Sequence, residues 1–285
     1  MRKLSSFLIF SFLLFTNCEN FGRLEVRAKL PQLLEEVSGI QYDAKADAFW
    51  MLNDSGNSSS VFLVTEQGDI RKELVINARN KDWEDITQDK KGNLYIGDFG
   101  NNRNSRRDLK ILKVDVLDLI SDEQIEVEEI EFWYPEQEKF PPKKKRRYYD
   151  TEAFFEWNGF FYIFTKSRVK NEIGRTFLYQ VPNQKGKHKA KLIADFTTCP
   201  EERCWITSAD ITKDGKKVVL LNEKSAWIFT NFKENNFFSG NAKEFSFGHE
   251  SQKESITFKN NNTIYVADEQ RKTSGRNLYF LRLTD

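Results

Sequence analysis

The chain has 285 residues, of which 14% are aromatic and 25 are Phe, so it can bury a large hydrophobic core. Its 44 Lys and Arg residues nearly balance its 43 Asp and Glu residues, which leaves a formal charge of +1. This balance excludes an overall attraction to nucleic acid or to an anionic membrane surface, and any electrostatic function must therefore be local.

The N-terminus has the pattern of a bacterial secretion signal. Two basic residues precede an apolar stretch from Leu4 to Phe15, which is too short for a membrane-spanning helix of about 20 residues. Cys18 follows closely and resembles the lipidated first residue of a bacterial lipoprotein. Asn17 departs from the small residue that usually precedes this Cys.

We therefore expect three parts: a lipoprotein-type signal peptide at 1–17, the lipidated Cys18 with a short tether at 18–22, and a single domain at 23–285. The protein would be exported to the cell envelope, with a bacterial membrane as partner through the lipid on Cys18. A conventionally cleaved, soluble export product is the alternative.

The rest of the chain repeats one unit five times. Each unit begins with a strand that ends in a polar turn, and the first strands are predicted at Glu36–Asp43, Asp82–Asp89, Asp150–Trp157, Thr207–Asp214 and Lys253–Asn260. The second strands are short apolar runs typical of strands buried on both faces, at Ala48–Asp54, Asn93–Phe99, Phe160–Lys166, Val218–Lys224 and Thr263–Glu269.

A third strand follows in every unit, and four units contain a fourth. The third strands are expected to begin at Val61, Leu109, Thr176, Ala226 and Leu278, and the fourth strands to occupy Lys72–Asn77, Ile125–Tyr134, Ala190–Phe196 and Ala242–Phe247. Four-stranded units without helical periodicity are typical of the blades of a β-propeller.

The last unit lacks a fourth strand, and the start of the domain supplies a candidate. Arg23–Leu30 alternates apolar with charged residues and precedes the first unit, so it would complete the last blade and close the ring. The sequence therefore predicts an all-β, five-bladed propeller of four-stranded antiparallel blades. A six-bladed propeller is the alternative, if Ser121–Tyr149 contains a further hairpin.

The order of these segments carries a resemblance. "SGI", "NDSGN", "DWEDI", "LYIGDFGNN", "DTEAFF" and "YIFTK", in this order, resemble bacterial exported propeller proteins of uncharacterised function. More distantly, the chain is similar to the propeller family described as "esterase-like activity of phytase". The resemblance implies the propeller fold and covers most of the mature chain, but no single motif is diagnostic of a reaction.

Propeller topology predicts that the starts of the first strands and the ends of the second strands lie at one mouth of the central channel. Many carboxylates occupy these positions, and a hard cation would offset their repulsion. Oxygen ligands without His or Cys favour Ca²⁺ over Zn²⁺. We expect the metal ligands to be Glu84, Glu152, Glu254 and Asp268. The alternative is that these carboxylates cap loop N–H groups and have a structural role only.

The same mouth is expected to bind an unknown small molecule or protein. The basic run at 143–147 and the Arg-rich loop at 101–107 lie on this face by topology and could hold an anionic group. The basic run lacks the spaced aromatics that nucleic-acid binding needs, so no nucleic-acid partner is expected. The candidate ligand-binding residues are Asn53, Asp54, Trp83, Asp85, Asp98, Arg103, Lys143, Arg147, Asn222 and Glu223.

Two residues are candidates for catalysis, although no nucleophile motif accompanies them. His249 precedes the last first strand and could act as a general base, and Lys166 ends the second strand of the third unit. Cys199 and Cys204 form an even pair in an exported chain, which suggests a disulfide that constrains a loop; free thiols are the alternative.

Two functions follow from these features. The first is a non-enzymatic, lipid-anchored protein that binds a ligand or partner at an acidic channel mouth flanked by basic loops. The second is a Ca²⁺-dependent hydrolase of a phosphoester, ester or lactone. In that mechanism the metal activates water, and Lys166 or the run at 143–147 stabilises the developing anion.

Overall fold

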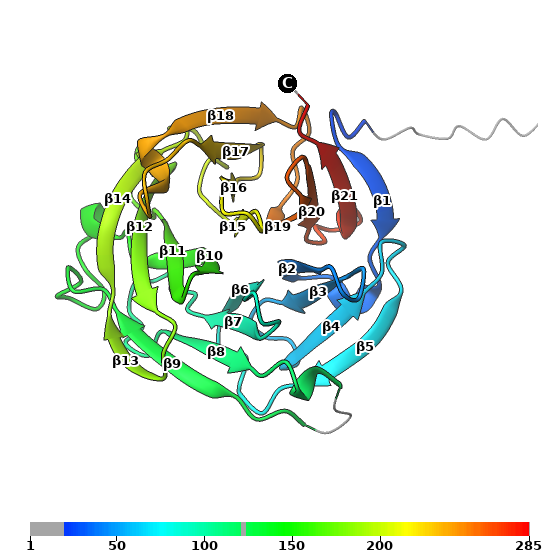
Figure 1. Ribbon diagram of the computed structural model, residues 1–285. Helices are drawn as coiled ribbons and strands as arrows, with labels where there is room; N and C mark the ends of the chain where they lie inside the picture. The colour runs from blue at the N-terminus through cyan, green and yellow to red at the C-terminus, as the bar shows by residue number, and fades with distance from the viewer. Residues whose placement is uncertain (1–19, 121–123, 285) are drawn as a thin grey trace, which may run out of the picture.

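The protein is an all-β, five-bladed propeller, and the computed structural model describes residues 20–120 and 124–284 (Figure 1). Blade 1 consists of β2 (Val37–Asp43), β3 (Ala48–Asn53), β4 (Ser60–Val64) and β5 (Ile70–Val75). Blade 2 consists of β6 (Trp83–Gln88), β7 (Leu94–Asp98), β8 (Lys110–Val114) and β9 (Glu128–Trp133). Blade 3 consists of β10 (Asp150–Trp157), β11 (Phe160–Lys166), β12 (Arg175–Pro182) and β14 (Lys191–Thr197). Blade 4 consists of β15 (Ser208–Ile211), β16 (Lys217–Leu221), β17 (Ser225–Thr230) and β18 (Asn241–Ser246).

Blade 5 is built from both ends of the domain. It consists of β19 (Lys253–Asn260), β20 (Thr263–Asp268), β21 (Asn277–Arg282) and, as its outer strand, β1 (Glu25–Lys29). Figure 1 shows β1 beside β21 at the outer edge of the ring. The prediction that the N-terminal strand closes the propeller is therefore confirmed.

The six-bladed alternative is wrong. Between β8 and β10, the described residues form a single strand, β9, and two short 3-10 helices, η2 (Asp118–Ile120) and η3 (Lys144–Arg146). Two further 3-10 helices are η1 (Gln32–Leu34) and η4 (Phe237–Ser239). In the described part of the chain, no helix is long and apolar enough to cross a membrane.

One strand was not predicted. β13 (Gly186–Lys189) comes from the link between β12 and β14 of blade 3, but it pairs in parallel with β9 and extends the sheet of blade 2 to five strands. Lys187 of β13 also forms an ion pair of 3.0 Å with Glu131 of β9. The segment GKHK has no apolar alternation, so nothing in its sequence indicated a strand.

The core lies between the blades. The second strands β3, β7 and β20 are buried at every position, as expected for strands with a sheet on each side. Aromatic side chains fill much of the space between blades 2 and 3, where Phe99 packs edge-on against Phe132 and Phe154. This packing fixes the first strands around the axis, and with them the side chains that face the channel.

Buried polar side chains connect the first strands of neighbouring blades. Asp85 has no exposed surface, and its carboxylate accepts hydrogen bonds from the backbone N–H of Phe154 (3.4 Å) and from the Ser208 hydroxyl (3.1 Å). Asp210 accepts hydrogen bonds from the N–H of Phe258 (2.7 Å) and the hydroxyl of Thr257 (3.0 Å). These side chains satisfy donors that no neighbouring strand reaches.

Closure by the N-terminal strand predicts unequal effects of substitutions within it. Leu30, directly after β1, is 1% exposed, whereas Val26 within β1 is 39% exposed. We expect Leu30→Ala to lower the free energy of unfolding by about 3 kcal/mol and Val26→Ala by under about 1 kcal/mol, measured by urea denaturation. Equal losses would contradict the closure described here.

Candidate functional site

The first strands begin, and the second strands end, around a polar cavity of about 170 Å³ at one end of the propeller axis, here called the central cavity. It is lined by Ser38, Asp54, Glu84, Asn102, Glu152, Lys166, Arg168, Thr207, Gln252, Glu254 and Glu269. Five of these side chains carry carboxyl groups and two carry cations. The arrangement of the strands thus brings together residues that are far apart in the sequence.

Both cations of the central cavity are already paired. Lys166, at the end of β11, contacts the carboxylate of Glu152 on β10. Arg168 donates to Glu152 (3.0 Å) and to the fully buried Asp150 (2.5 Å). Burial alone would lower the pKa of Lys166, but the carboxylates of Glu152, Glu254 and Asp150 together outweigh burial and raise it. Lys166 is therefore a charged structural partner rather than a free base.

The carboxyl groups on the blade 1 and blade 2 side of the cavity lack such partners. Asp54, Asp82 and Glu84 each place one carboxylate oxygen within 4.8 Å of the others. Glu84 is only 6% exposed, lines the central cavity, and forms no side-chain hydrogen bond or ion pair with any described residue. Glu254, on β19, likewise has no such partner in the described part of the chain.

Burial and mutual repulsion make these groups hold protons. Burial, followed by repulsion from Asp54, raises the pKa of Asp82 to about 6 and that of Glu269 to about 8. Burial also raises the pKa of Glu84 and of Glu254 well above the ordinary value, and Glu152 adds repulsion at both. The cavity therefore gathers more carboxyl groups than Lys166 and Arg168 can neutralise, and Glu269 keeps its proton at neutral pH when no cation is bound.

Several predicted site residues lie outside this cavity. Trp83 has no exposed surface and packs between blades 1 and 2, so it cannot touch a ligand as predicted. Asp85 is the buried link between first strands described above. Asp98 is 1% exposed and pairs with Arg106 (2.9 Å). The contacts of these three residues hold the fold together, and none of them lines the central cavity.

Asp268, Asn53 and Asn222 also serve the fold. Asp268 is fully buried and accepts hydrogen bonds from the Asn277 N–H and the Tyr279 hydroxyl, both at 2.7 Å, so it does not join the other predicted metal ligands. The amide of Asn53 donates to the Leu33 carbonyl oxygen (2.8 Å). The Asn222 side chain caps the turn that precedes β17.

The predicted basic residues do not line the central cavity. Arg103 and Lys143 are exposed, and Arg147 is half-buried. The backbone carbonyl of Arg147 accepts a hydrogen bond from the N–H of Arg168 (2.8 Å), so the end of the basic run lies beside the cavity. These three side chains therefore lie outside the lining of the central cavity.

His249 lies in a neighbouring pocket of about 340 Å³, which shares Gln252 and Glu269 with the central cavity. Its ring packs edge-on against Phe21, with centroids 5.2 Å apart, and its Nδ1 lies 3.3 Å from the ammonium nitrogen of Lys253. His249 therefore lines this neighbouring pocket rather than the central cavity.

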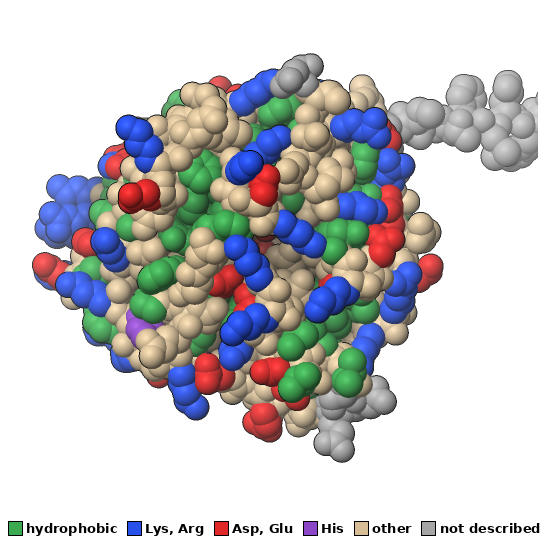
Figure 2. All heavy atoms as spheres, viewed as in Figure 1, with side chains coloured by type: hydrophobic (Ala, Val, Ile, Leu, Met, Phe, Trp, Pro, Cys, Tyr) green, Lys and Arg blue, Asp and Glu red, His purple; other side chains and the backbone are tan. Residues whose placement is uncertain are grey.

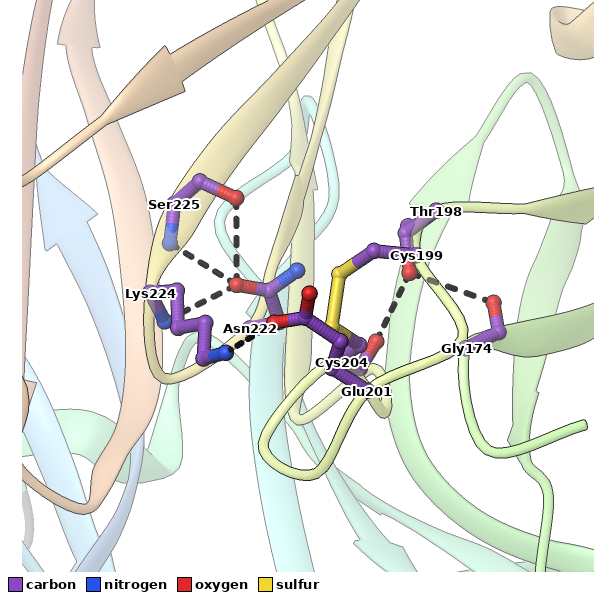
Figure 3. The surroundings of a disulfide bond; sticks show 8 residues. All are labelled: Gly174, Thr198, Cys199, Glu201, Cys204, Asn222, Lys224 and Ser225. Carbon is purple, nitrogen blue, oxygen red and sulfur yellow. Dashed lines mark hydrogen bonds and ion pairs between the residues drawn. A yellow bond between two sulfur atoms is a disulfide. The ribbon is translucent and has the colours of Figure 1, made fainter. Parts of the chain in front are cut away.

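A disulfide fixes the loop between β14 and β15. It joins Cys199 to Cys204, whose Cα atoms are 5.6 Å apart, and the Thr198 hydroxyl donates to the carbonyl oxygen of Cys204 (2.8 Å; Figure 3). The loop presents Arg203, which lies 3.6 Å from the predicted residue Glu223 and 2.9 Å from Glu250. Arg203 lines the neighbouring pocket that contains His249, so the loop forms one wall of that pocket.

Sequence reasoning missed several residues of the site, among them the charged residues Arg168 and Asp82. Arg168 follows β11 by two residues, so it lay beyond the strand ends that were considered. Asp82 immediately precedes β6, and its place in "DWEDI" was a usable signal because acidic residues at Glu84 and Asp85 flank the same Trp.

Comparison with known proteins assigns the chain to no family. No family model matches the chain, and no curated protein matches it. Among solved structures, it is similar to catalytically inactive virginiamycin B lyase from Staphylococcus aureus, crystallised with quinupristin. The identity is 14% over 90% of this chain and 69% of that one, with a TM-score of 0.41.

A second similar structure comes from a nidogen/laminin complex. The identity is 12% over 81% of this chain and 72% of that one, with a TM-score of 0.45. Both are propeller proteins. At this identity and TM-score, neither similarity bears on the site or the reaction.

The buried ion pair predicts a pH-dependent substitution effect. We expect Lys166→Met to lower the free energy of unfolding by about 3 kcal/mol at pH 8, because it leaves Glu152 charged without its main partner. The loss should be smaller at pH 5, where Glu152 can take up a proton. Adding Glu152→Gln should recover much of the loss, and equal losses at both pH values would contradict this pairing.

The raised pKa values predict how stability depends on pH in the absence of metal. Asp82 and Glu269 stay protonated in the folded state up to about pH 6 and about pH 8, but ionise near their ordinary values when unfolded. The folded state therefore binds more protons in this window, and the free energy of unfolding should fall as the pH rises from 5 to 8. Denaturation in EDTA across this range checks the sign, and a rise in stability would refute it.

Proposed function

We propose that this protein is an exported, lipid-anchored propeller that binds a positively charged ligand, a divalent cation such as Ca²⁺, in the central cavity. One observation carries the proposal. Glu84 is almost fully buried, faces the cavity without a partner among the described residues, and lies beside Asp54 and Asp82. A buried carboxylate is costly unless it is paired or bound to a metal.

The donor set fits a hard cation. Ca²⁺ takes six to eight oxygen ligands at about 2.3–2.6 Å, so oxygens on opposite sides of the ion lie about 5 Å apart. The carboxylate oxygens of Asp54, Asp82 and Glu84 lie within 4.8 Å of one another, which suits one such ion. Glu254 and Glu269 line the same cavity and could contribute further charge.

A hydrolase would use the same cation and is the second function considered. It would also need a cationic group free to stabilise a developing anion. Lys166 and Arg168 are the cations of the cavity, and both form ion pairs with Glu152. Binding without catalysis is therefore the function that this geometry favours.

Export and anchoring rest on the sequence. Cys18 and the signal-like segment before it lie outside the described residues. The disulfide between Cys199 and Cys204 supports an oxidising compartment, because such bonds are rare in the reducing cytosol.

Thermal unfolding of the chain from Asn20 onward, in EDTA and then with Ca²⁺, Mg²⁺ or Mn²⁺, tests cation binding. A ligand that binds only the folded state stabilises it by about 2.7 kcal/mol at a concentration of 100 Kd. We expect a rise in Tm that grows with the concentration of one cation and is lost below about pH 6, where the carboxyl groups hold protons.

Glu84→Gln keeps the shape of the side chain and removes its charge, so it should abolish the cation-dependent rise. Glu244→Gln, on the exposed outer strand of blade 4, is the matched control and should leave the rise unchanged. A flat response of the unmodified chain to all three cations would overturn the metal proposal. A rise that survives Glu84→Gln would place the ion elsewhere.

A further inference from the structure

The opposite end of the propeller axis carries a second pocket, of about 270 Å³, between the turns that join the first and second strands. We call it the lysine pocket, because Lys45, Lys90 and Lys213 lie on its lining. Figure 2 shows this face, where Lys and Arg side chains gather around the centre with Asp and Glu side chains among them. None of these residues belongs to the central cavity.

The carboxylates of the lysine pocket accept hydrogen bonds from backbone N–H groups of the turns that form it. Asp43 accepts hydrogen bonds from the N–H groups of Lys45 (2.8 Å) and Ala46 (3.2 Å), and from the Trp50 indole (3.1 Å). Asp89 accepts three backbone N–H groups between 2.8 and 3.0 Å, from residues 91–93. Such bonds hold a turn in shape and leave a carboxylate with few free lone pairs.

Asp210 and Glu156, the two remaining acidic residues of the pocket, also accept hydrogen bonds from backbone N–H groups. Asp210 accepts from the N–H groups of Ile211 and Phe258, both at 2.7 Å, and Glu156 accepts from the N–H of Gly159 at 2.6 Å. All four carboxylates thus face backbone donors. They do not pair with the lysines around them.

The lysines are available for a ligand. Lys45 and Lys213 are exposed, and their ammonium groups form no hydrogen bond or ion pair with any residue in 20–120 or 124–284. Lys90 lies over the ring of Trp157, with its ammonium nitrogen 3.9 Å from the ring centroid, and donates to the Asn158 side chain (3.0 Å). Three cations from blades 1, 2 and 4 therefore surround one opening.

The pocket also has an apolar wall. Trp157, Ile211, Val116 and Leu119 line it and are all half-buried, so each offers part of its surface to the pocket. Three cations around a partly apolar hollow favour a ligand with two parts, an anionic group and a small apolar body. A purely ionic ligand would leave the apolar wall unused.

We propose that the lysine pocket is a second binding site, which takes a small organic anion with an aromatic or aliphatic body. The anionic group, a carboxylate, sulfonate or phosphate, lies among Lys45, Lys90 and Lys213, and the apolar body packs against Trp157 and Leu119. This site is independent of the cation site in the central cavity, because the two share no lining residue.

The test uses 8-anilinonaphthalene-1-sulfonate as the probe, with the folded chain from Asn20 onward. We expect saturable binding at one site, which weakens as salt rises because the ion pairs are exposed. The double variant Lys45→Gln/Lys213→Gln should weaken binding at least fivefold. Trp157→Phe should reduce energy transfer from tryptophan to the bound probe.

The control is the double variant Lys185→Gln/Lys191→Gln, which removes two exposed charges of blade 3 that do not line the pocket. It should leave the affinity unchanged. No saturable binding, or equal affinity in the two double variants, would overturn the proposal. Far-ultraviolet circular dichroism checks that each variant is folded, and the cation-dependent Tm of Lys45→Gln/Lys213→Gln shows separately whether the central cavity still responds.

Discussion

The propeller depends on the way its innermost strands are joined. No backbone ladder connects one blade to the next at the axis, so the N–H groups that face across the gap need other acceptors. Asp85 and Asp210 supply them from fully buried or nearly buried positions. Asp85 joins blade 2 to blades 3 and 4, and Asp210 joins blade 4 to blade 5. Their carboxylates fix the angular position of the first strands, and every channel-facing side chain takes its place from that arrangement.

This geometry also brings many carboxylates close together at one end of the axis, where they repel one another. Strand starts and strand ends from all blades converge there, so any acidic residue at these positions is brought close to the others. In blade 3 this repulsion is offset, because Lys166 and Arg168 pair with Glu152 and Asp150. Among the described residues, no cation pairs with Asp54, Asp82 or Glu84 in blades 1 and 2, and the cation site proposed above rests on this asymmetry.

The fold was largely predictable, because buried second strands such as Asn93–Phe99 repeat a pattern that chain order alone reveals. The closing strand was also predictable, from its alternation and from the incomplete last unit. The strand β13 was not, because its polar sequence has no apolar alternation and it pairs along the edge of β9, a strand of another blade.

The site was predictable in position but not in membership. Topology placed the acidic residues at one mouth, yet the orientation of each side chain depends on local bulges that a sequence does not display. The register shift between Trp83 and Asp85 is one such bulge, and it lies where Glu84 turns toward the cavity while Trp83 turns into the core. The structural role of Asp268 was not predictable for a similar reason. It depends on a hydrogen bond from Tyr279, which lies on the next strand and not beside Asp268 in the sequence.

The closing strand has a consequence for the order in which the fold can be completed. β1 belongs to blade 5, whose other three strands are made last, so the first strand to be synthesised waits for nearly the whole chain before it can pair. Contacts of such long sequence separation are slow to form. Until then β1 and β21 each present an open edge that can pair with another molecule. A nascent chain of this kind gains from being kept apart from its neighbours until its final strand has emerged.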